Sequence, residues 1–277
     1  ILPLLLFRFR MLKRCPIILC PRGELGDGAL AINPTKKKLF IALAKFLRLH
    51  NKVKWQASNI QEKTQIERIF GSNINVVISS NLPVRNKSAS VDDLLSKCSG
   101  ELKLIYVGRV SPIKNIELAL ESLKNVTGNV VFDIYGPFES IEYLDSLKKI
   151  VAILPKTVSV IFKGEVSNNQ LEALFKNYHF FISPTKGENF GHSIFEALNY
   201  STPLIISNQT PWRNLSVSCA GWDIELSASE FTRVIQNCIS LENSDYRKLA
   251  LGAKKIANEY VEKSGVLKTS RELFVIK

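Results

Sequence analysis

The stretch FFISPTKGENFGHSIFEALNYSTPLIIS, residues 180–207, runs from an apolar strand through a polar loop into a helix and back to an apolar strand. Ile194 and Leu198 lie four positions apart, as residues on the buried face of a helix do. The two flanking runs are apolar almost throughout, which is typical of strands covered on both faces in a parallel sheet. The stretch therefore predicts one β–α–β unit of an open α/β sheet.

The same alternation continues on both sides of this unit. Apolar, β-branched runs predict six strands, at residues 102–107, 130–135, 158–162, 180–183, 203–207 and 221–224. Besides the helix that begins just after Gly191, helical periods predict helices at about 116–123, 140–153, 170–176, 228–241 and 245–262. We therefore predict an open, doubly wound α/β domain over residues 101–262.

The first third of the chain repeats this pattern only in part. Strands are expected at 16–20, 53–57 and 75–79, with helices at 35–49 and 59–70. This predicts an incomplete second α/β domain over residues 1–85. The polar, turn-rich stretch 86–100 is the predicted linker, and a last helix over 263–277 is expected to return to the first domain.

Composition limits the class of protein. The chain has 277 residues, 45% of them hydrophobic, which is enough for a sizeable core in one large domain or two moderate ones. The net charge of +12 comes mainly from residues 1–100, which hold 17 Lys/Arg against 6 Asp/Glu. Such a surplus fits either an anionic partner or a solvated basic face. Aromatic residues do not interleave with the basic ones, so nucleic acid is not expected as a partner.

The cysteines and the first residues bear on location. Five cysteines, without a CxxC pair, predict reduced thiols in a cytoplasmic protein rather than disulfides or a common zinc site. The apolar opening at residues 1–7 is too short to span a bilayer and lacks the preceding basic region of a signal peptide. Because the chain begins with Ile1, we expect an N-terminally incomplete polypeptide.

Ligands of open α/β sheets bind beyond the carboxyl ends of the strands, so the loops there are candidate sites. In VGRVSPIKN (107–115), Gly108 permits a tight turn, and Arg109 and Lys114 bring two cations to the start of a helix. Together they are suited to a diphosphate. The alternative is a plain turn with solvated cations. The loop is neither a Walker loop nor a GxGxxG fingerprint.

Two further loops follow later strands. In FKGEV (162–166), Gly164 would let the backbone approach a flat base. In the opening stretch, Glu188 lies in the loop and Glu196 about one and a half turns into the helix. The amides of Asn189, Phe190 and Gly191 would be free to donate, as the first amides of a helix are. The alternative is two unrelated surface carboxylates.

Five motifs follow one another in a set order: VGRVSPIKN (107–115), FDIYG (132–136), VIFKGEV (160–166), LEALFKNYHFFISPTKGENFGHSIFEALNYSTPLI (171–205) and TPWRNL (210–215). Together they resemble the donor-binding domain of retaining glycosyltransferases of the GT-B fold, family 4. That family has two glutamates separated by seven residues, and Glu188 and Glu196 match this spacing. Upstream, PRGELGDGAL (21–30) with KKKLFIALAKFLR (36–48) is similar to the later part of the first domain in sugar-transferring members.

The resemblance implies two Rossmann-like domains and specific roles. Arg109 and Lys114 would hold the diphosphate of a nucleotide-sugar, Glu188 and the following amides would contact the sugar, and Glu196 would bind the ribose. The backbone of the base-side loop would line the base: Lys163, Gly164, Glu165 and Val166. The resemblance further implies transfer to a glycan or lipid-linked acceptor with retention, without a metal or another cofactor.

Some features depart from the family pattern. Asn115, Asn189 and Ser201 stand where the family often has glycine, and the first domain lacks the βα units that carry a glycine-rich loop and much of the acceptor site. Donor binding is therefore expected to be intact and acceptor binding incomplete. The alternative is a non-catalytic nucleotide-sugar-binding protein or an inactive fragment.

The upstream part leaves three points open. Arg22, Gly23 and Glu24 form either a structural turn or an acceptor-side loop. The apolar residues of KKKLFIALAKFLR spread round most of the helix, which favours burial, but its lysines suit weak contact with an anionic membrane on the cytoplasmic side. His192 is expected to be an early helix residue facing water rather than a catalytic base.

Overall fold

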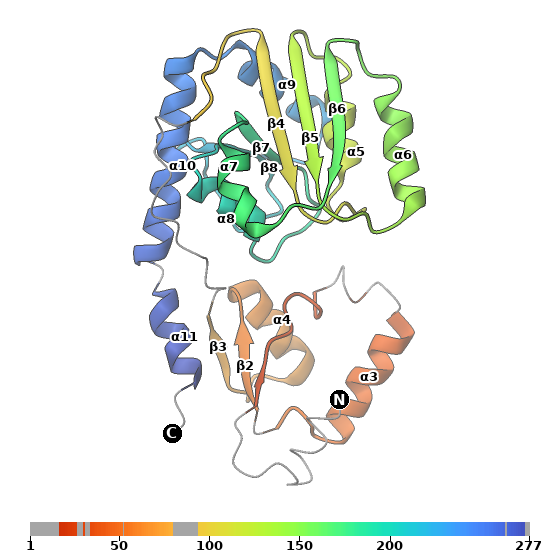
Figure 1. The fold of residues 1–277 in the computed structure, drawn as a ribbon. Coiled ribbons are helices and arrows are strands. Elements are labelled where there is room, and N and C mark those ends of the chain that lie inside the picture. Colours follow the sequence, from red (N-terminus) through yellow and green to blue (C-terminus); the bar gives the residue numbers. More distant parts are fainter. Residues whose placement is uncertain are drawn as a thin grey trace. The chain divides into compact units, whose positions relative to one another are not determined.

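The computed structural model describes residues 17–26, 30, 34–51, 53–79, 94–263 and 265–274. The chain divides into unit 1, residues 1–82 and 265–277, and unit 2, residues 83–264 (Figure 1). Each unit contains one parallel sheet, so the predicted α/β class is confirmed. The apolar opening at residues 1–7 and the first part of the expected linker, 86–93, lie outside the described residues.

The sheet of unit 2 has six parallel strands in the order β6-β5-β4-β7-β8-β9. Their bounds are β4 Glu101–Val107, β5 Asn129–Tyr135, β6 Val158–Gly164, β7 Phe180–Ser183, β8 Leu204–Ser207 and β9 Gly221–Ile224. The chain starts in the middle, moves outward to β6 and returns beside β4 with β7, as a doubly wound sheet does. The carboxyl ends of β4 and β7 therefore mark the switch point where such sheets bind ligands.

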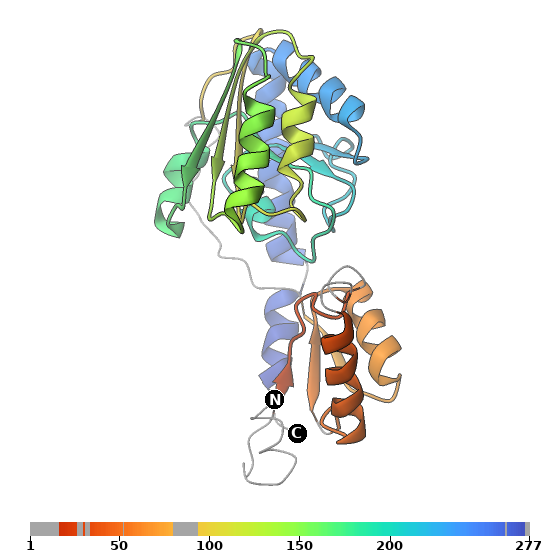
Figure 2. The same cartoon turned by 90° about the vertical axis from the view of Figure 1, so that its right-hand side faces the viewer.

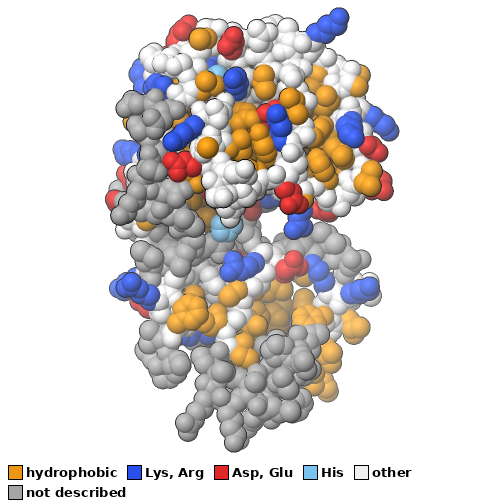
Figure 3. Space-filling model, viewed as in Figure 1, with side chains coloured by type: hydrophobic (Ala, Val, Ile, Leu, Met, Phe, Trp, Pro, Cys, Tyr) orange, Lys and Arg blue, Asp and Glu red, His pale blue; other side chains and the backbone are white. Residues whose placement is uncertain are grey.

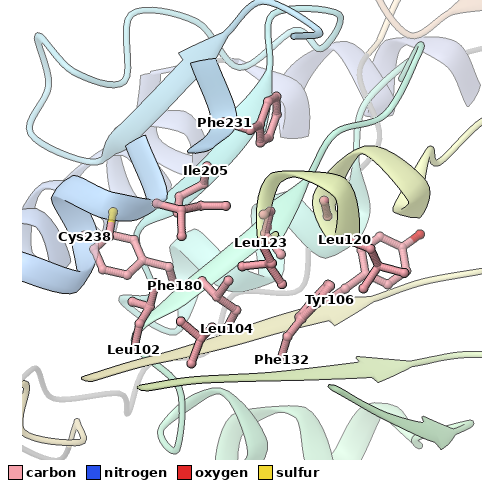
Figure 4. Packing of buried hydrophobic residues seen from close by; sticks show 14 of the residues in the cluster. Leu102, Leu104, Tyr106, Leu120, Leu123, Phe132, Phe180, Ile205, Phe231 and Cys238 are labelled. Atoms are coloured by element: carbon pink, nitrogen blue, oxygen red, sulfur yellow. The ribbon is translucent and has the colours of Figure 1, made fainter. Parts of the chain in front are cut away.

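Helices cover both faces of this sheet. One face carries α5 (Ile116–Ser122), α6 (Ile141–Val151) and α9 (Ala228–Ser240), with α5 and α6 side by side in Figure 2. The other carries the 3-10 turn η2 (Asn168–Gln170), α7 (Leu171–Phe175), α8 (His192–Asn199) and α10 (Asn243–Lys263). Leu104, Phe132 and Phe180 are fully buried under the first group (Figure 4). Each such side chain stabilises the fold by about 1.5–3 kcal/mol.

Within unit 2, two buried basic side chains fasten residues 96–98 to the rest of the unit. The ammonium group of Lys97 donates to the carbonyls of Cys98, Ile239 and Leu241 at 2.7, 3.0 and 3.1 Å, which closes the end of α9. Burial lowers the pKa of this amine. His179 accepts the Lys103 amide at Nδ1 at 3.0 Å, and its Nε2 faces the Ser96 carbonyl at 3.2 Å. Because burial lowers the pKa of His179 to about 4, the ring is neutral and Nε2–H is the donor.

Unit 1 is smaller. Its sheet has the order β1-β2-β3, with β1 Ile18–Leu19, β2 Lys54–Ala57 and β3 Val76–Ile78, and its helices are α3 Pro34–Phe46, α4 Ile60–Phe70 and α11 Val266–Phe274. Trp55 and Ile66 are buried between the sheet and α4. The chain end belongs to this unit, since the Ser270 hydroxyl of α11 lies 2.9 Å from that of Ser79 and Lys54 Nζ donates to the Leu273 carbonyl at 3.0 Å.

The expected burial of α3 is wrong. Ala44 is the buried residue of this helix, whereas the side chains of Leu39, Leu43 and Phe46 are 71%, 48% and 83% exposed. A helix that is apolar on most sides needs neighbours on several sides, and the described part of unit 1 shields it mainly along Ala44. Hydrophobic side chains gather over α3 in Figure 3, with lysines near its first turn. None of the helices in the described part of the chain is both long and apolar enough to cross a membrane.

Candidate functional site

Three loops of unit 2 are hydrogen-bonded to one another beyond the carboxyl ends of β4, β7 and β8. The Ile113 carbonyl, in the loop after β4, accepts the Lys186 amide at 2.8 Å and the Thr185 hydroxyl at 3.2 Å, both from the loop after β7. The Glu188 amide donates to the carbonyl of Gln209, after β8, at 3.1 Å. The loops at 107–115 and 184–191 therefore lie together at one candidate site. Residue spacing in the sequence alone did not decide between this arrangement and unrelated surface loops.

The loop after β4 also lies against the loop after β5. The Gly108 amide donates to the Tyr135 carbonyl at 2.9 Å, and the Gly136 amide donates to the Gly164 carbonyl at 2.7 Å. A Cβ atom on Gly136, whose φ is 136°, would come within 1.9 Å of the Gly108 carbonyl oxygen. Gly136 thus permits the close approach of these loops. The sequence reasoning missed this residue, although a glycine directly after a strand is a usable signal.

Lys114 and Glu188 form an ion pair across the switch point. Their side chains are only 23% and 22% exposed, so water screens the pair partially. Arg109 lies nearby in sequence but is exposed, and no ion pair joins it to the rest of the described chain. Its backbone is held because the buried Tyr106 hydroxyl donates to the Arg109 carbonyl at 2.9 Å. Burial, together with the charge of Glu188, raises the pKa of Tyr106, which keeps this hydroxyl a donor.

Glu196 lies in the second turn of α8 and is half-buried. Its carboxylate accepts no hydrogen bond from the residues that the structure describes. Burial raises its pKa to about 7. Hydrogen bonds donated by a ligand would stabilise the charged form of this unpaired carboxyl group, which burial makes costly.

The loop before α8 presents backbone donors. Gly191 has left-handed geometry, with φ at 79°, and no side chain caps α8. The amides of Phe190 and Gly191 have no acceptor within the described part of the chain. Asn189 is half-buried in the same loop, and His192 is exposed at the start of the helix. The loop thus offers unpaired N–H groups beside Glu188, whose Cγ lies within 3.1 Å of a Cβ built on Gly191.

The backbone is left-handed at two of the three positions where the family that this chain resembles often has glycine. Asn115 and Ser201 have φ values of 57° and 62°, whereas Asn189 does not lie in this region. Left-handed backbone costs a residue with a side chain roughly 1–2 kcal/mol, and somewhat less for asparagine. Asn115 and Ser201 therefore adopt a backbone geometry that glycine adopts at a lower cost.

The base-side loop is less regular. Gly164 is left-handed with φ at 74°, Glu165 is exposed and Val166 is half-buried. Lys163 extends its ammonium group to within 3.5 Å of the Asp133 carboxylate on β5. Asp133 is buried and accepts the Tyr178 hydroxyl at 2.6 Å, but its other oxygen has no partner among the described atoms. Sequence reasoning passed over Asp133, although a charge within an apolar strand is a signal.

In unit 1, Arg22, Gly23 and Glu24 form a turn after β1. Arg22 and Gly23 are both left-handed, with φ at 50° and 88°. The turn is held by the buried Glu62, which accepts the Gly23 amide at 2.6 Å and the Ser58 amide at 2.7 Å. Glu24 pairs with Lys37 at 2.9 Å. These contacts account for the turn structurally, and a role toward an acceptor stays a prediction.

The described residues contain no group of three or more His, Cys, Asp and Glu side chains that could hold a metal ion.

Comparison with known proteins shows which family the central part of the chain resembles. Residues 95–217 match the family model of glycosyl transferases group 1. The O-antigen chain mannosyltransferase RfbU of Salmonella typhimurium is 28% identical over 132 residues, which is 48% of this chain and 37% of that protein. The alpha-monoglucosyldiacylglycerol synthase of Streptococcus pneumoniae is 30% identical over 140 residues, or 48% of this chain and 30% of that protein. The matched stretch thus spans about a third of these relatives.

Solved structures extend the likeness in fold to nearly the whole chain. Anabaena Alr3699/HepE, in complex with UDP and glucose, aligns with a TM-score of 0.72 at 14% identity and covers 98% of this chain and 74% of that one. WaaG, a glycosyltransferase involved in lipopolysaccharide biosynthesis, aligns with a TM-score of 0.68 at 11% identity over 92% of this chain and 73% of its own. Residues 95–217 are therefore similar to the glycosyl transferases group 1 family, and the two parallel α/β sheets match the GT-B fold of these solved structures.

Proposed function

We propose that unit 2 binds a nucleotide-diphosphate-sugar and that the protein transfers the sugar, with retention, to a glycan or lipid-linked acceptor. The observation that carries the proposal is the Lys114–Glu188 ion pair at the switch point, beside the unpaired amides before α8. A cation and a carboxylate so placed suit the two halves of a donor, its diphosphate and its sugar. Glu196 would accept hydrogen bonds from the ribose, and residues 163–166 would line the base.

Catalysis would depend on positioning and electrostatics. In the ligand-free protein Glu188 neutralises Lys114. A diphosphate that enters the site would replace Glu188 as the partner of the Lys114 ammonium group. The released Glu188 carboxylate would then accept hydrogen bonds from the sugar hydroxyls. Lys114 and Arg109 would then stabilise the negative charge that develops on the leaving diphosphate, in a site where these donors are already in place. A metal ion is not required in this scheme.

Relatives indicate the substrate classes to test first. Alr3699/HepE is described with UDP and with UDP-glucose, RfbU is named for O-antigen and the pneumococcal synthase for a diacylglycerol lipid. For this chain we propose a nucleoside-diphosphate hexose as donor and a cell-envelope glycan or glycolipid as acceptor, with a cytoplasmic location.

Calorimetric titration with UDP-, GDP- and ADP-sugars tests the proposal. We expect saturable binding of at least one of them and release of its nucleoside diphosphate when acceptor is supplied. Failure of every nucleotide-sugar to bind would contradict the proposed function. Binding without hydrolysis or transfer, also by the product of the full coding sequence, would support the non-catalytic alternative.

The exposed face of α3 supports weak membrane contact. Leu39, Leu43 and Phe46 are exposed beside Lys36 and Lys38, a combination that lets apolar side chains enter the interface while lysines meet anionic lipid. We expect more binding to vesicles containing phosphatidylglycerol than to pure phosphatidylcholine, and loss of the difference in about 1 M salt, where charges are screened beyond about 3 Å.

Two variants separate this face from other exposed apolar groups. Phe46→Ser should reduce cosedimentation with anionic vesicles, whereas Leu251→Ser, at a residue that is 57% exposed on α10, should leave it unchanged. Equal binding to anionic and neutral vesicles, or equal effects of both variants, would contradict the contact.

A further inference from the structure

A cluster of four aromatic rings lies directly beneath the loop that carries Glu188. Phe190 comes from the loop, Phe195 from α8, Trp212 from the segment after β8 and Tyr260 from α10. All six ring pairs have centroid distances between 5.3 Å, for Trp212 and Tyr260, and 6.0 Å, for Phe190 and Phe195. Phe190, Phe195 and Trp212 are almost fully buried. The loop therefore rests on a rigid base drawn from three distant segments.

One hydrogen bond joins this base to the loop backbone. The indole Nε1–H of Trp212 donates to the Phe190 carbonyl at 2.5 Å in a buried position. That carbonyl belongs to the same peptide group as the Gly191 amide. Because the peptide is planar and trans, the carbonyl and the N–H point in opposite directions. Holding the carbonyl against the indole thus points the Gly191 N–H away from Trp212.

The peptide needs such a restraint. Gly191 lacks a side chain and is left-handed, so rotation of this peptide group meets little local resistance. A Cβ atom here would lie 2.8 Å from Ile194 Cδ1 and 3.1 Å from Glu188 Cγ, so a larger residue would force these side chains to shift. The Trp212 indole therefore restrains the orientation of the Phe190–Gly191 peptide, which a side chain at position 191 would otherwise restrict.

Trp212 is itself fixed. The Thr210 hydroxyl accepts the Trp212 amide at 3.2 Å. On the following side, Arg213 Nε pairs with Asp223 of β9 at 3.2 Å, and the same carboxylate accepts the Leu215 amide at 2.9 Å. The segment that carries Trp212 is thus anchored to β9, and the indole in turn contacts the loop before α8.

We propose that Trp212 is a positioning residue for the donor: its indole orients the Phe190–Gly191 peptide so that the Gly191 amide donates to the sugar or the diphosphate of a bound nucleotide-sugar. This inference rests on the proposed function. Trp212 contacts no substrate itself and acts through the backbone of the loop. A nucleoside monophosphate lacks both the sugar that is transferred and the second phosphate, so it would not use this amide.

Trp212→Phe tests the proposal because it keeps an aromatic ring and removes the N–H. Loss of one neutral hydrogen bond corresponds to about a 3- to 10-fold effect. We expect affinity for the best-bound nucleotide-sugar to fall by about that factor, with affinity for the matching monophosphate unchanged. Trp222→Phe, at a half-buried tryptophan of β9 in the other core cluster, is the matched control and should change neither affinity. Equal losses for both ligands in Trp212→Phe would overturn the positioning role.

A measurement on the ligand-free protein keeps the two proposals separate. In ¹⁵N-labelled protein, the Trp212 indole proton should exchange slowly, and the Gly191 amide resonance should move in Trp212→Phe but not in Trp222→Phe. An unmoved Gly191 resonance would overturn the inference even if donor binding is confirmed. If the unsubstituted chain binds no nucleotide-sugar, the proposed function fails, and with it the ligand assigned to Gly191.

Discussion

Lys114→Met is expected to lower kcat for release of the nucleoside diphosphate by about 10²- to 10³-fold, the usual cost of removing one preorganised charge or donor from a developing anion. The substitution keeps the length of the side chain and removes the charge that would stabilise the leaving diphosphate. It also leaves Glu188 without its partner, so affinity for the free nucleoside diphosphate should fall too. Initial rates at saturating donor and calorimetry give the two quantities.

Lys124→Met is the control for this substitution. Lys124 is also partly exposed, on the segment just after α5, and pairs with Glu121 at 2.5 Å, so it is a paired lysine that lies away from the switch point. Its loss should leave kcat and affinity near those of the unsubstituted protein. If Lys114→Met retained the kcat of the Lys124→Met variant, Lys114 would not act on the leaving group.

Glu196→Ala is expected to weaken binding of free nucleotide and of nucleotide-sugar alike by about 10- to 100-fold, since hydrogen bonds to a charged group contribute roughly 1.5–3 kcal/mol. Glu188→Ala should spare free nucleoside monophosphate and impair binding of the sugar-bearing donor. The reason is their placement: Glu196 lies on α8, whereas Glu188 lies in the loop after β7 and pairs with Lys114. Equal losses of free-nucleotide affinity in both variants would refute this division.

The pH dependence gives an independent measurement of Glu196. Burial raises its pKa to about 7, so the carboxylate that is proposed to accept the ribose hydroxyls is depleted on the acid side. Nucleotide affinity should therefore rise from about pH 6 to about pH 8 as the group ionises. Glu196→Gln should abolish this rise, whereas Glu142→Gln, at an exposed residue of α6, should preserve it. A rise that persists in Glu196→Gln would assign it to another group.

Local sequence patterns predicted the strands of unit 2 well. Each strand is an apolar run bounded by a turn, and β4 to β9 lie within a residue or two of the expected positions. Neighbours along the chain are enough to specify such elements. The location of the candidate loops beyond the carboxyl ends of the strands followed from the general behaviour of open α/β sheets, whereas the order of the strands was not predicted.

The features that sequence reasoning missed depend on partners far away in the chain. Lys114 and Glu188 were assigned to one site, but their pairing joins residues 74 positions apart. Trp212 and Phe190 are 22 apart, and TPWRNL carried no local sign that its indole would meet a carbonyl. The exposure of α3 likewise depends on which segments surround it, and its apolar composition does not specify them.

The buried Lys97 has a use as a chemical probe. Its amine is enclosed by three carbonyls at the end of α9 and is only 2% exposed. A reagent that acylates amines reaches Lys97 only when residues 96–98 detach from the rest of unit 2, whereas it reaches surface lysines at once. The rate at which Lys97 becomes acylated, measured by mass spectrometry, therefore reports how often this part of unit 2 opens. A bound donor that stabilises the closed unit would lower the acylation rate.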